Sequence, residues 1–129
     1  MPAANSMTVL VVDDQNTMRG YVMNCLRQLG ITNVTSARDG TDALRKMMGL
    51  RFDLVISDWV MEDMQGIDLL KQVRKHPVLR KTPFIMASTQ SDHDLIETAV
   101  AAGVDNYLIK PFEIDQLEAS IEAVVGSLE

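Results

Sequence analysis

Five side chains that could take part in chemistry each lie at the end of a short apolar run. The runs read VLVV, LVIS, FIMA and YLI. The five residues at their ends are Asp13, Asp14, Asp58, Ser88 and Lys110. Carboxylates, a hydroxyl and an ammonium are the groups that hold a divalent cation and stabilise a transferring phosphoryl group. The order of these residues along the chain therefore indicates a phosphoryl-transfer site.

Three carboxylates gathered in one place repel one another unless a cation lies between them. An all-oxygen set with room for water and phosphate suits Mg²⁺. A carboxylate beside such a metal can attack a phosphoryl group and become an acyl phosphate, while Lys110 supplies the ammonium that neutralises the transferring oxygens. The hydroxyl of Ser88 can hydrogen-bond a phosphoryl oxygen after transfer, which would convert the chemistry into a local rearrangement.

Each of these features also has an ordinary structural explanation. An Asp-Asp pair after a strand is often a helix N-cap and turn, a serine at a strand end is often a loop residue, and Lys-Pro is a common surface turn. A functional site is favoured because all five residues follow apolar runs in the same chain.

The elements that would position these residues alternate between strand and helix. Strands are predicted at 8–12, near 34, and at 53–57, 83–87 and 106–109, and helices at 16–29, 41–48 (closed by Gly49), 67–76, 92–102 and from about 113. The connections leave no room for hairpins, so right-handed crossovers and a parallel sheet are expected. We expect an α/β fold, a doubly wound, flavodoxin-like three-layer sandwich. Its strands end at one edge, where such folds bind ligands.

The composition limits the classes of function. A chain of 129 residues fits one domain, expected over residues 8–129 after a flexible lead at 1–7. The net charge of -6 opposes binding to nucleic acid, and no basic stretch suits an anionic membrane. No apolar run approaches the roughly 20 residues of a spanning helix, so we expect a cytoplasmic protein. The lone Cys25 is expected to be a buried, inert thiol, and most methionines are expected in the core.

Four motifs together carry a resemblance to a known family. They are VDD at 12–14, DWVMEDMQG at 58–66, AST at 87–89 and KPF at 110–112. With them the sequence resembles the response-regulator receiver family, in particular its single-domain CheY-like members, from about residue 7 to the C-terminus. That family has a five-stranded sheet in the order 2-1-3-4-5.

The resemblance implies a two-component response regulator with a site made of five residues. Asp58 would accept a phosphoryl group from a histidine kinase or a histidine phosphotransfer protein. Asp13 and Asp14 would bind Mg²⁺ together with Asp58 and the backbone carbonyl of Val60. Lys110 would contact the phosphate. Such a protein is a phosphoacceptor switch with its own autophosphorylation and autodephosphorylation chemistry, and not an enzyme in the usual sense.

The resemblance also implies how the signal leaves the site. Ser88 takes the position of the switch hydroxyl, and Tyr107 takes that of the aromatic residue that changes rotamer. The alternative for Tyr107 is a strand residue half packed on the final helix. The Lys110–Pro111 peptide would be cis. The target would be a protein that binds the fourth helix, fifth strand and fifth helix, with the flagellar motor switch as the candidate if the output is chemotaxis.

The sequence departs from the family pattern close to the site. Glu62 stands where the family usually has proline, which predicts a less rigid and more negative loop. Val60 and Gln90 occupy positions that the family uses to shape the access of water to the acyl phosphate, so the rate of autodephosphorylation is not predicted. Trp59 is expected at the exposed edge of the site, where its indole would contribute to packing rather than function and would serve as a reporter.

Three alternatives remain at this point. A receiver excised from a larger regulator would have the same sequence. An Asp-nucleophile phosphatase needs an acid two residues after its nucleophile, and Val60 stands there. A flavodoxin-type cofactor site needs a hydroxyl- and Gly-rich phosphate loop, whereas residues 13–16 are acidic and would repel phosphate.

The face expected to bind the target is rich in acids, which predicts a basic or amphipathic partner segment. The acids are Asp92, Asp94, Glu97, Asp105, Glu113, Asp115 and Glu118.

Overall fold

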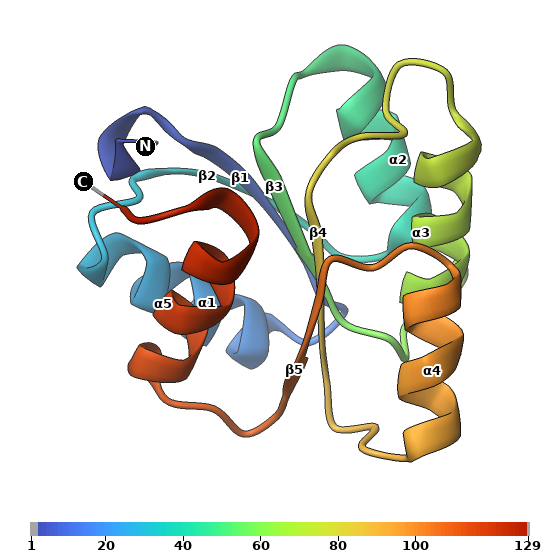
Figure 1. The fold of residues 1–129 in the computed structure, drawn as a ribbon. Coiled ribbons are helices and arrows are strands. Elements are labelled where there is room, and N and C mark those ends of the chain that lie inside the picture. The colour runs from blue at the N-terminus through green and yellow to red at the C-terminus, as the bar shows by residue number, and fades with distance from the viewer. Residues whose placement is uncertain (1–2, 129) are drawn as a thin grey trace.

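The computed structural model describes residues 3–128, and five strands alternate with five helices along them (Figure 1). The strands are β1 (Thr8–Val12), β2 (Asn33–Ala37), β3 (Leu54–Ser57), β4 (Phe84–Ser88) and β5 (Asn106–Ile109). The helices are α1 (Asn16–Gln28), α2 (Gly40–Gly49), α3 (Gly66–Lys75), α4 (His93–Ala101) and α5 (Ile114–Val125). A short 3-10 turn, Ala4–Ser6, precedes β1.

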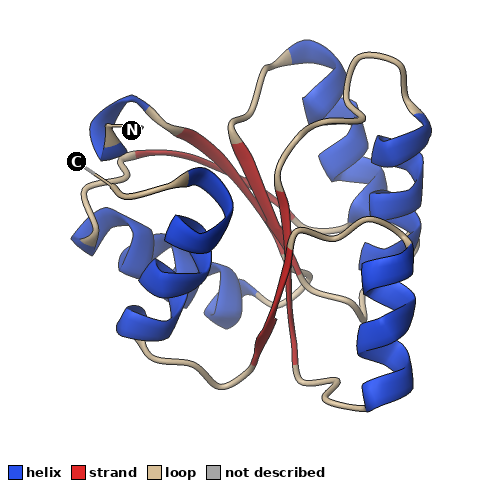
Figure 2. Ribbon diagram, in the orientation of Figure 1, coloured by secondary structure: helices blue, strands red, loops and turns tan. Residues whose placement is uncertain are grey.

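The strands form one parallel sheet in the order β2-β1-β3-β4-β5. Helices α1 and α5 cover one face, and α2, α3 and α4 cover the other, which makes three layers (Figure 2). The predicted doubly wound, flavodoxin-like sandwich is confirmed. Every strand enters from the same edge of the sheet, because each crossover helix returns the chain to that edge.

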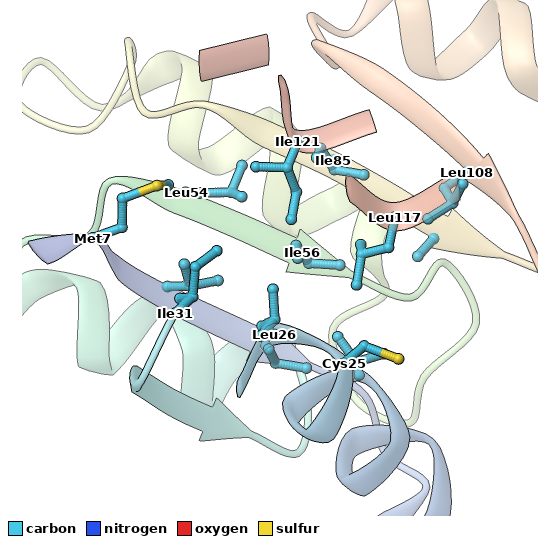
Figure 3. Close-up of a cluster of buried hydrophobic side chains, with 14 of the residues drawn as sticks. Met7, Cys25, Leu26, Ile31, Leu54, Ile56, Ile85, Leu108, Leu117 and Ile121 are labelled. Atoms are coloured by element: carbon cyan, nitrogen blue, oxygen red, sulfur yellow. The ribbon is translucent and has the colours of Figure 1, made fainter. Parts of the chain in front are cut away.

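The core is divided between the two faces because successive side chains of a strand point in opposite directions. In β1, Val9 and Val11 pack under α1 and α5, where Leu26, Ile56 and Ile121 also lie (Figure 3). The alternate residues of β1 belong to the second cluster, under α2, α3 and α4. This two-sided burial explains why the strand is a continuous apolar run.

The predicted elements are all present; β1 and β5 have the predicted bounds, and the other predicted boundaries differ by at most one residue. Gly30 has φ 89° and follows the end of α1, as the sequence predicted. Gly49 does not close α2 from outside as expected, because it is the last helical residue and the chain becomes extended only at Leu50. Cys25 is buried, and Met48 is a methionine of α2 that lies outside the core.

The division of the chain into a lead and a domain at residue 7 stays a prediction. Two residues of the lead, Ala4 and Met7, are buried in the cluster under α1 and α5. Within residues 3–128, no helix has both the length and the apolar character needed to cross a membrane.

Candidate functional site

The carboxyl edge of the sheet gathers the acidic residues that the sequence singled out. Asp13 and Asp14 directly follow β1, and Asp58 directly follows the neighbouring strand β3. One carboxylate oxygen from each of the three lies within 4.8 Å of the others. The parallel topology thus turns residues far apart in sequence into one cluster.

Lys110, the first residue after β5, places its ammonium between two of these carboxylates. Its Nζ lies 2.7 Å from Asp13 Oδ2 and 3.5 Å from Asp58 Oδ2. The lysine side chain is only 7% exposed and that of Asp13 only 4% exposed. Burial strengthens these ion pairs relative to surface pairs, so the ammonium offsets part of the repulsion within the acidic cluster.

Backbone and side-chain donors from the start of α1 hold Asp13 in place. The Gln15 N–H donates to Asp13 Oδ1 at 2.9 Å, and Arg19 Nη1 donates to the Asp13 carbonyl at 2.6 Å. Because α1 begins three residues after Asp13, the helix and the acidic turn are positioned together.

Asp58 is the carboxylate most affected by its surroundings. Burial raises the pKa of Asp58 above its ordinary value, and the nearby charge of Asp13 raises it further. The ammonium of Lys110 and the Trp59 N–H, which donates to Asp58 Oδ1 at 2.7 Å, oppose this rise in pKa. The Asp58 carboxylate therefore lies close to two other carboxylates, one ammonium and a backbone donor.

Gly66 is a site residue to which the sequence analysis gave no role. A Cβ on Gly66 would lie 1.9 Å from the backbone oxygen of Asp58, a distance at which the chain must shift. The Gly66 N–H also donates to the Trp59 carbonyl at 2.9 Å, which folds the loop back onto the strand end. The available signal was that Gly66 is the only glycine between Asp58 and Gly103.

Two residues predicted to act in the switch meet at Gln90. The Oγ of the fully buried Ser88 accepts from the Gln90 N–H at 3.1 Å, and Tyr107 Oη donates to the Gln90 carbonyl at 2.5 Å. Burial raises the pKa of the Tyr107 hydroxyl, and the charge of Asp58 adds to the rise. The loop after β4 is thus linked to both residues.

Trp59 and Tyr107 differ from two sequence-based expectations. Trp59 is buried, so its placement at an exposed edge was wrong. Its ring centroid lies 6.4 Å from that of Tyr107, which packs on the cluster under α2, α3 and α4. The alternative that Tyr107 packs on the final helix is therefore also wrong. Both expectations failed because the two side chains pack against each other, although they are far apart in the sequence.

The donor set fits a hard divalent cation. Asp13 and Asp14 with Asp58 supply only oxygen ligands, and Asp14 is exposed to solvent, so the site is accessible to a hydrated ion. A cavity of about 460 Å³ adjoins the cluster and is lined by Asp14, Gln15, Met18, Asp58, Val60, Thr89, Gln90, Lys110 and Pro111. The cavity offers space for a phosphoryl group beside the carboxylates.

The loop that carries Lys110 is held by a residue that the sequence analysis missed. Tyr21, on α1, donates its Oη to the Phe112 carbonyl at 2.5 Å, and the two ring centroids lie 5.7 Å apart. The Lys110–Pro111 peptide between β5 and this contact is cis, as predicted. No local pattern marks Tyr21, because its partner lies at the other end of the chain.

Comparison with known proteins matches this arrangement to one family. A family model described as the response regulator receiver domain matches residues 9–122. The chain is 42% identical over 129 residues to a probable chemotaxis protein CheY of Rhizobium etli, with all of both chains covered. It is 42% identical over 118 residues to the chemotaxis protein CheY of Pseudomonas aeruginosa, covering 92% of this chain and 95% of that protein.

A solved structure supports the same relationship. The chemotaxis protein CheY4 of Vibrio cholerae superposes with a TM-score of 0.85 at 34% identity, covering 92% of this chain and 99% of that chain.

Proposed function

The chain belongs to the response regulator receiver domain family, and on that basis we propose that Asp58 is the phosphoacceptor of a two-component response regulator. The observation that carries the proposal is the position of the Lys110 ammonium between Asp13 and Asp58, beside a third carboxylate. An attacking carboxylate, a cation-binding pair and a charge-neutralising ammonium lie together there.

Phosphorylation would proceed by transfer from a phosphohistidine of a histidine kinase or a histidine phosphotransfer protein. An oxygen of Asp58 forms a bond to phosphorus while the phosphorus–nitrogen bond of the donor breaks. The bonding electrons stay on the imidazole nitrogen, which takes up a proton from water. The product is an acyl phosphate on Asp58, and Lys110 neutralises charge on the phosphoryl oxygens.

Asp13 and Asp14 with Asp58 would hold Mg²⁺, joined by the Val60 carbonyl as the family resemblance implies. When bound, Mg²⁺ neutralises the phosphoryl oxygens and the acidic cluster during transfer. Asp13 also keeps Lys110 at the site through its ion pair, so Asp13 would both bind the cation and position the ammonium. The protein acts as a switch that is modified and restored, and not as an enzyme that turns over an external substrate.

The switch would run from Ser88 to Tyr107. A phosphoryl oxygen that draws the Ser88 hydroxyl toward itself removes that hydroxyl from the Gln90 N–H. Gln90 also accepts from Tyr107 through its carbonyl, so a shift of the loop changes the partner of the tyrosine. Tyr107 lies on β5, within the α4, β5 and α5 face that would bind the target protein.

The proposed output is chemotaxis, with the flagellar motor switch as the candidate target. The supporting observation is that relatives described as chemotaxis proteins match nearly end to end. The acidic face favours a basic or amphipathic partner segment. Asp105 already has a partner within the chain, since Arg74 Nη2 donates to Asp105 Oδ2 at 2.9 Å. A cytoplasmic location and the absence of nucleic-acid or membrane partners belong to the same proposal.

The experiment that tests the phosphoacceptor is titration with beryllofluoride, or with acetyl phosphate, in the presence of Mg²⁺. Trp59 is the only tryptophan, and its backbone N–H donates to Asp58 Oδ1, so its fluorescence should change on activation. Mass spectrometry after acetyl phosphate should add one phosphoryl group at Asp58. Asp58→Asn should abolish both signals.

A matched control distinguishes the loss of the acceptor Asp58 from the loss of any carboxylate in the same loop. Asp63→Asn removes a carboxylate from the exposed part of the same loop and should leave both signals within about twofold of the unmodified protein. Labelling of Asp58→Asn, or loss of labelling in Asp63→Asn with Asp58 intact, would show that the assignment is wrong.

A further inference from the structure

The amino edge of the sheet, opposite the phosphoryl site, carries a groove between two loops. The loop from α2 to β3 and the loop from α3 to β4 lie side by side at the top of the view in Figure 1, whereas the strand ends that carry the site point to the bottom. Residues of both loops line a cavity of about 620 Å³, called here the amino-edge groove. None of its lining residues belongs to the acidic cluster.

The groove is bordered by apolar side chains that are unusually exposed. Met48 is 61% exposed, Leu50 is 56% exposed and Val78 is 81% exposed. They are three of the seven exposed large hydrophobic residues within 3–128, yet all three line this one groove. Phe52 and Met47, which also line it, are buried members of the core. Convergent exposed apolar groups over an apolar floor are typical of a binding surface.

The charge of the groove is opposite to that of the whole chain. Arg51 and Lys81 line it and are exposed, and neither takes part in an ion pair within residues 3–128. The only acid in its lining, Asp53, uses its carboxylate to accept the Thr8 N–H at 2.9 Å. The net charge of the chain is -6. The two cations outnumber the single carboxylate of Asp53, so the lining keeps a positive charge beside its apolar groups, which favours carboxylates.

We propose that the amino-edge groove docks a short segment of a partner protein in which apolar side chains are flanked by Asp or Glu. The apolar side chains would cover Met48, Leu50 and Val78, and the carboxylates would pair with Arg51 and Lys81. A lipid surface fits less well, because the site is concave and a chain of charge -6 is repelled by anionic headgroups. The proposal goes beyond phosphorylation, and its test uses the unphosphorylated chain.

The test is selection of phage-displayed random 12-residue peptides on the full chain, followed by fluorescence anisotropy with the enriched peptides. The expected peptides combine apolar residues with Asp or Glu. Leu50→Glu should weaken their binding by about tenfold or more, and so should Arg51→Glu combined with Lys81→Glu.

One control variant matches the charge reversal away from the groove. Lys71→Glu reverses an exposed cation on α3. It should keep the affinity within about twofold. Urea unfolding followed by Trp59 fluorescence verifies that every variant is folded.

Three results would overturn the proposal. The first is that no peptide is enriched over selection on empty beads. The second is that enriched peptides lack acids or bind the groove variants as well as the unmodified chain. The third is cosedimentation with vesicles of equal phosphatidylserine and phosphatidylcholine that is lost in Leu50→Glu, which would identify a lipid surface instead.

Discussion

Removal of one hydroxyl, in Tyr21→Phe, is expected to loosen the loop that carries Lys110. The Tyr21 Oη donates to the Phe112 carbonyl at 2.5 Å, and this hydrogen bond joins α1 to the loop after β5. Phenylalanine keeps the ring that packs on Phe112, with centroids 5.7 Å apart, and loses only the hydrogen bond. The change therefore tests the bond without creating a cavity.

The expected loss of stability in Tyr21→Phe follows from how exposed the hydrogen bond is. A hydrogen bond of this kind contributes about 0.5–1.5 kcal/mol net. Tyr21 is 38% exposed, so water can replace part of the bond to the Phe112 carbonyl. We expect the free energy of unfolding to fall by about 1 kcal/mol, which lowers Tm by about 4 °C in a domain of this size. If the same energy is lost in the transition state for phosphoryl transfer, phosphorylation slows about fivefold.

The assay combines urea unfolding with the rate of the Trp59 fluorescence change on addition of acetyl phosphate and Mg²⁺. Tyr107→Phe is the matched control, because it removes an equally short bond to a backbone carbonyl, that of Gln90, outside the Lys110 loop. Tyr21→Phe should slow phosphorylation, whereas Tyr107→Phe should lose stability with a smaller effect on the rate.

A Tyr21→Phe protein with unchanged stability and an unchanged rate would refute the role of the bond. A loss of stability with an unchanged rate would show that Tyr21 stabilises the fold without positioning Lys110.

Three further predictions concern other contacts. Gly66→Ala should abolish phosphorylation and lower stability by several kcal/mol, because its Cβ would lie 1.9 Å from the Asp58 carbonyl oxygen; circular dichroism and acetyl phosphate labelling would check this, and labelling at the normal rate would contradict it. Arg74→Met should cost about 2–3 kcal/mol in urea unfolding, since Arg74 donates to three backbone carbonyls and to Asp105, while Arg80→Met, which removes an exposed side chain, should change little. In EDTA, Asp58→Asn should be more stable than the unmodified protein near neutral pH. The raised pKa means that the folded state binds this proton more tightly than the unfolded state, so the destabilisation by the Asp58 carboxylate is present above the folded pKa and disappears as pH falls through that value toward the unfolded pKa. Urea unfolding midpoints measured across pH would test the sign of this stability difference. A stability advantage of Asp58→Asn that grows as pH falls would contradict the prediction.

Much of the fold could be predicted because its signals are local. A continuous apolar run bounded by acids predicts a strand buried on both faces, and β1 has the predicted bounds Thr8–Val12. Gly30 predicts a helix end because glycine adopts positive φ at little cost. Gly49 carried the same signal without that conformation, which shows that glycine alone does not decide a boundary.

The members of the site could be predicted for a topological reason. Once the strands are parallel, every residue that follows a strand lies at one edge of the sheet. Asp13, Asp58 and Lys110 therefore had to approach one another whatever their separation in the chain. The sequence by itself thus determined the class of fold, the edge that carries the chemistry and the groups available there.

Only the tertiary structure decided which of these groups touch and what supports them. The 2.7 Å pair of Lys110 with Asp13, the hold of Tyr21 on Phe112 and the approach of Gly66 to Asp58 all depend on the packing of whole elements. Packing also turned the indole of Trp59 inward and left Met48 outside the core. Such contacts have no local pattern, because their geometry is set by how closely distant helices and strands pack on one another.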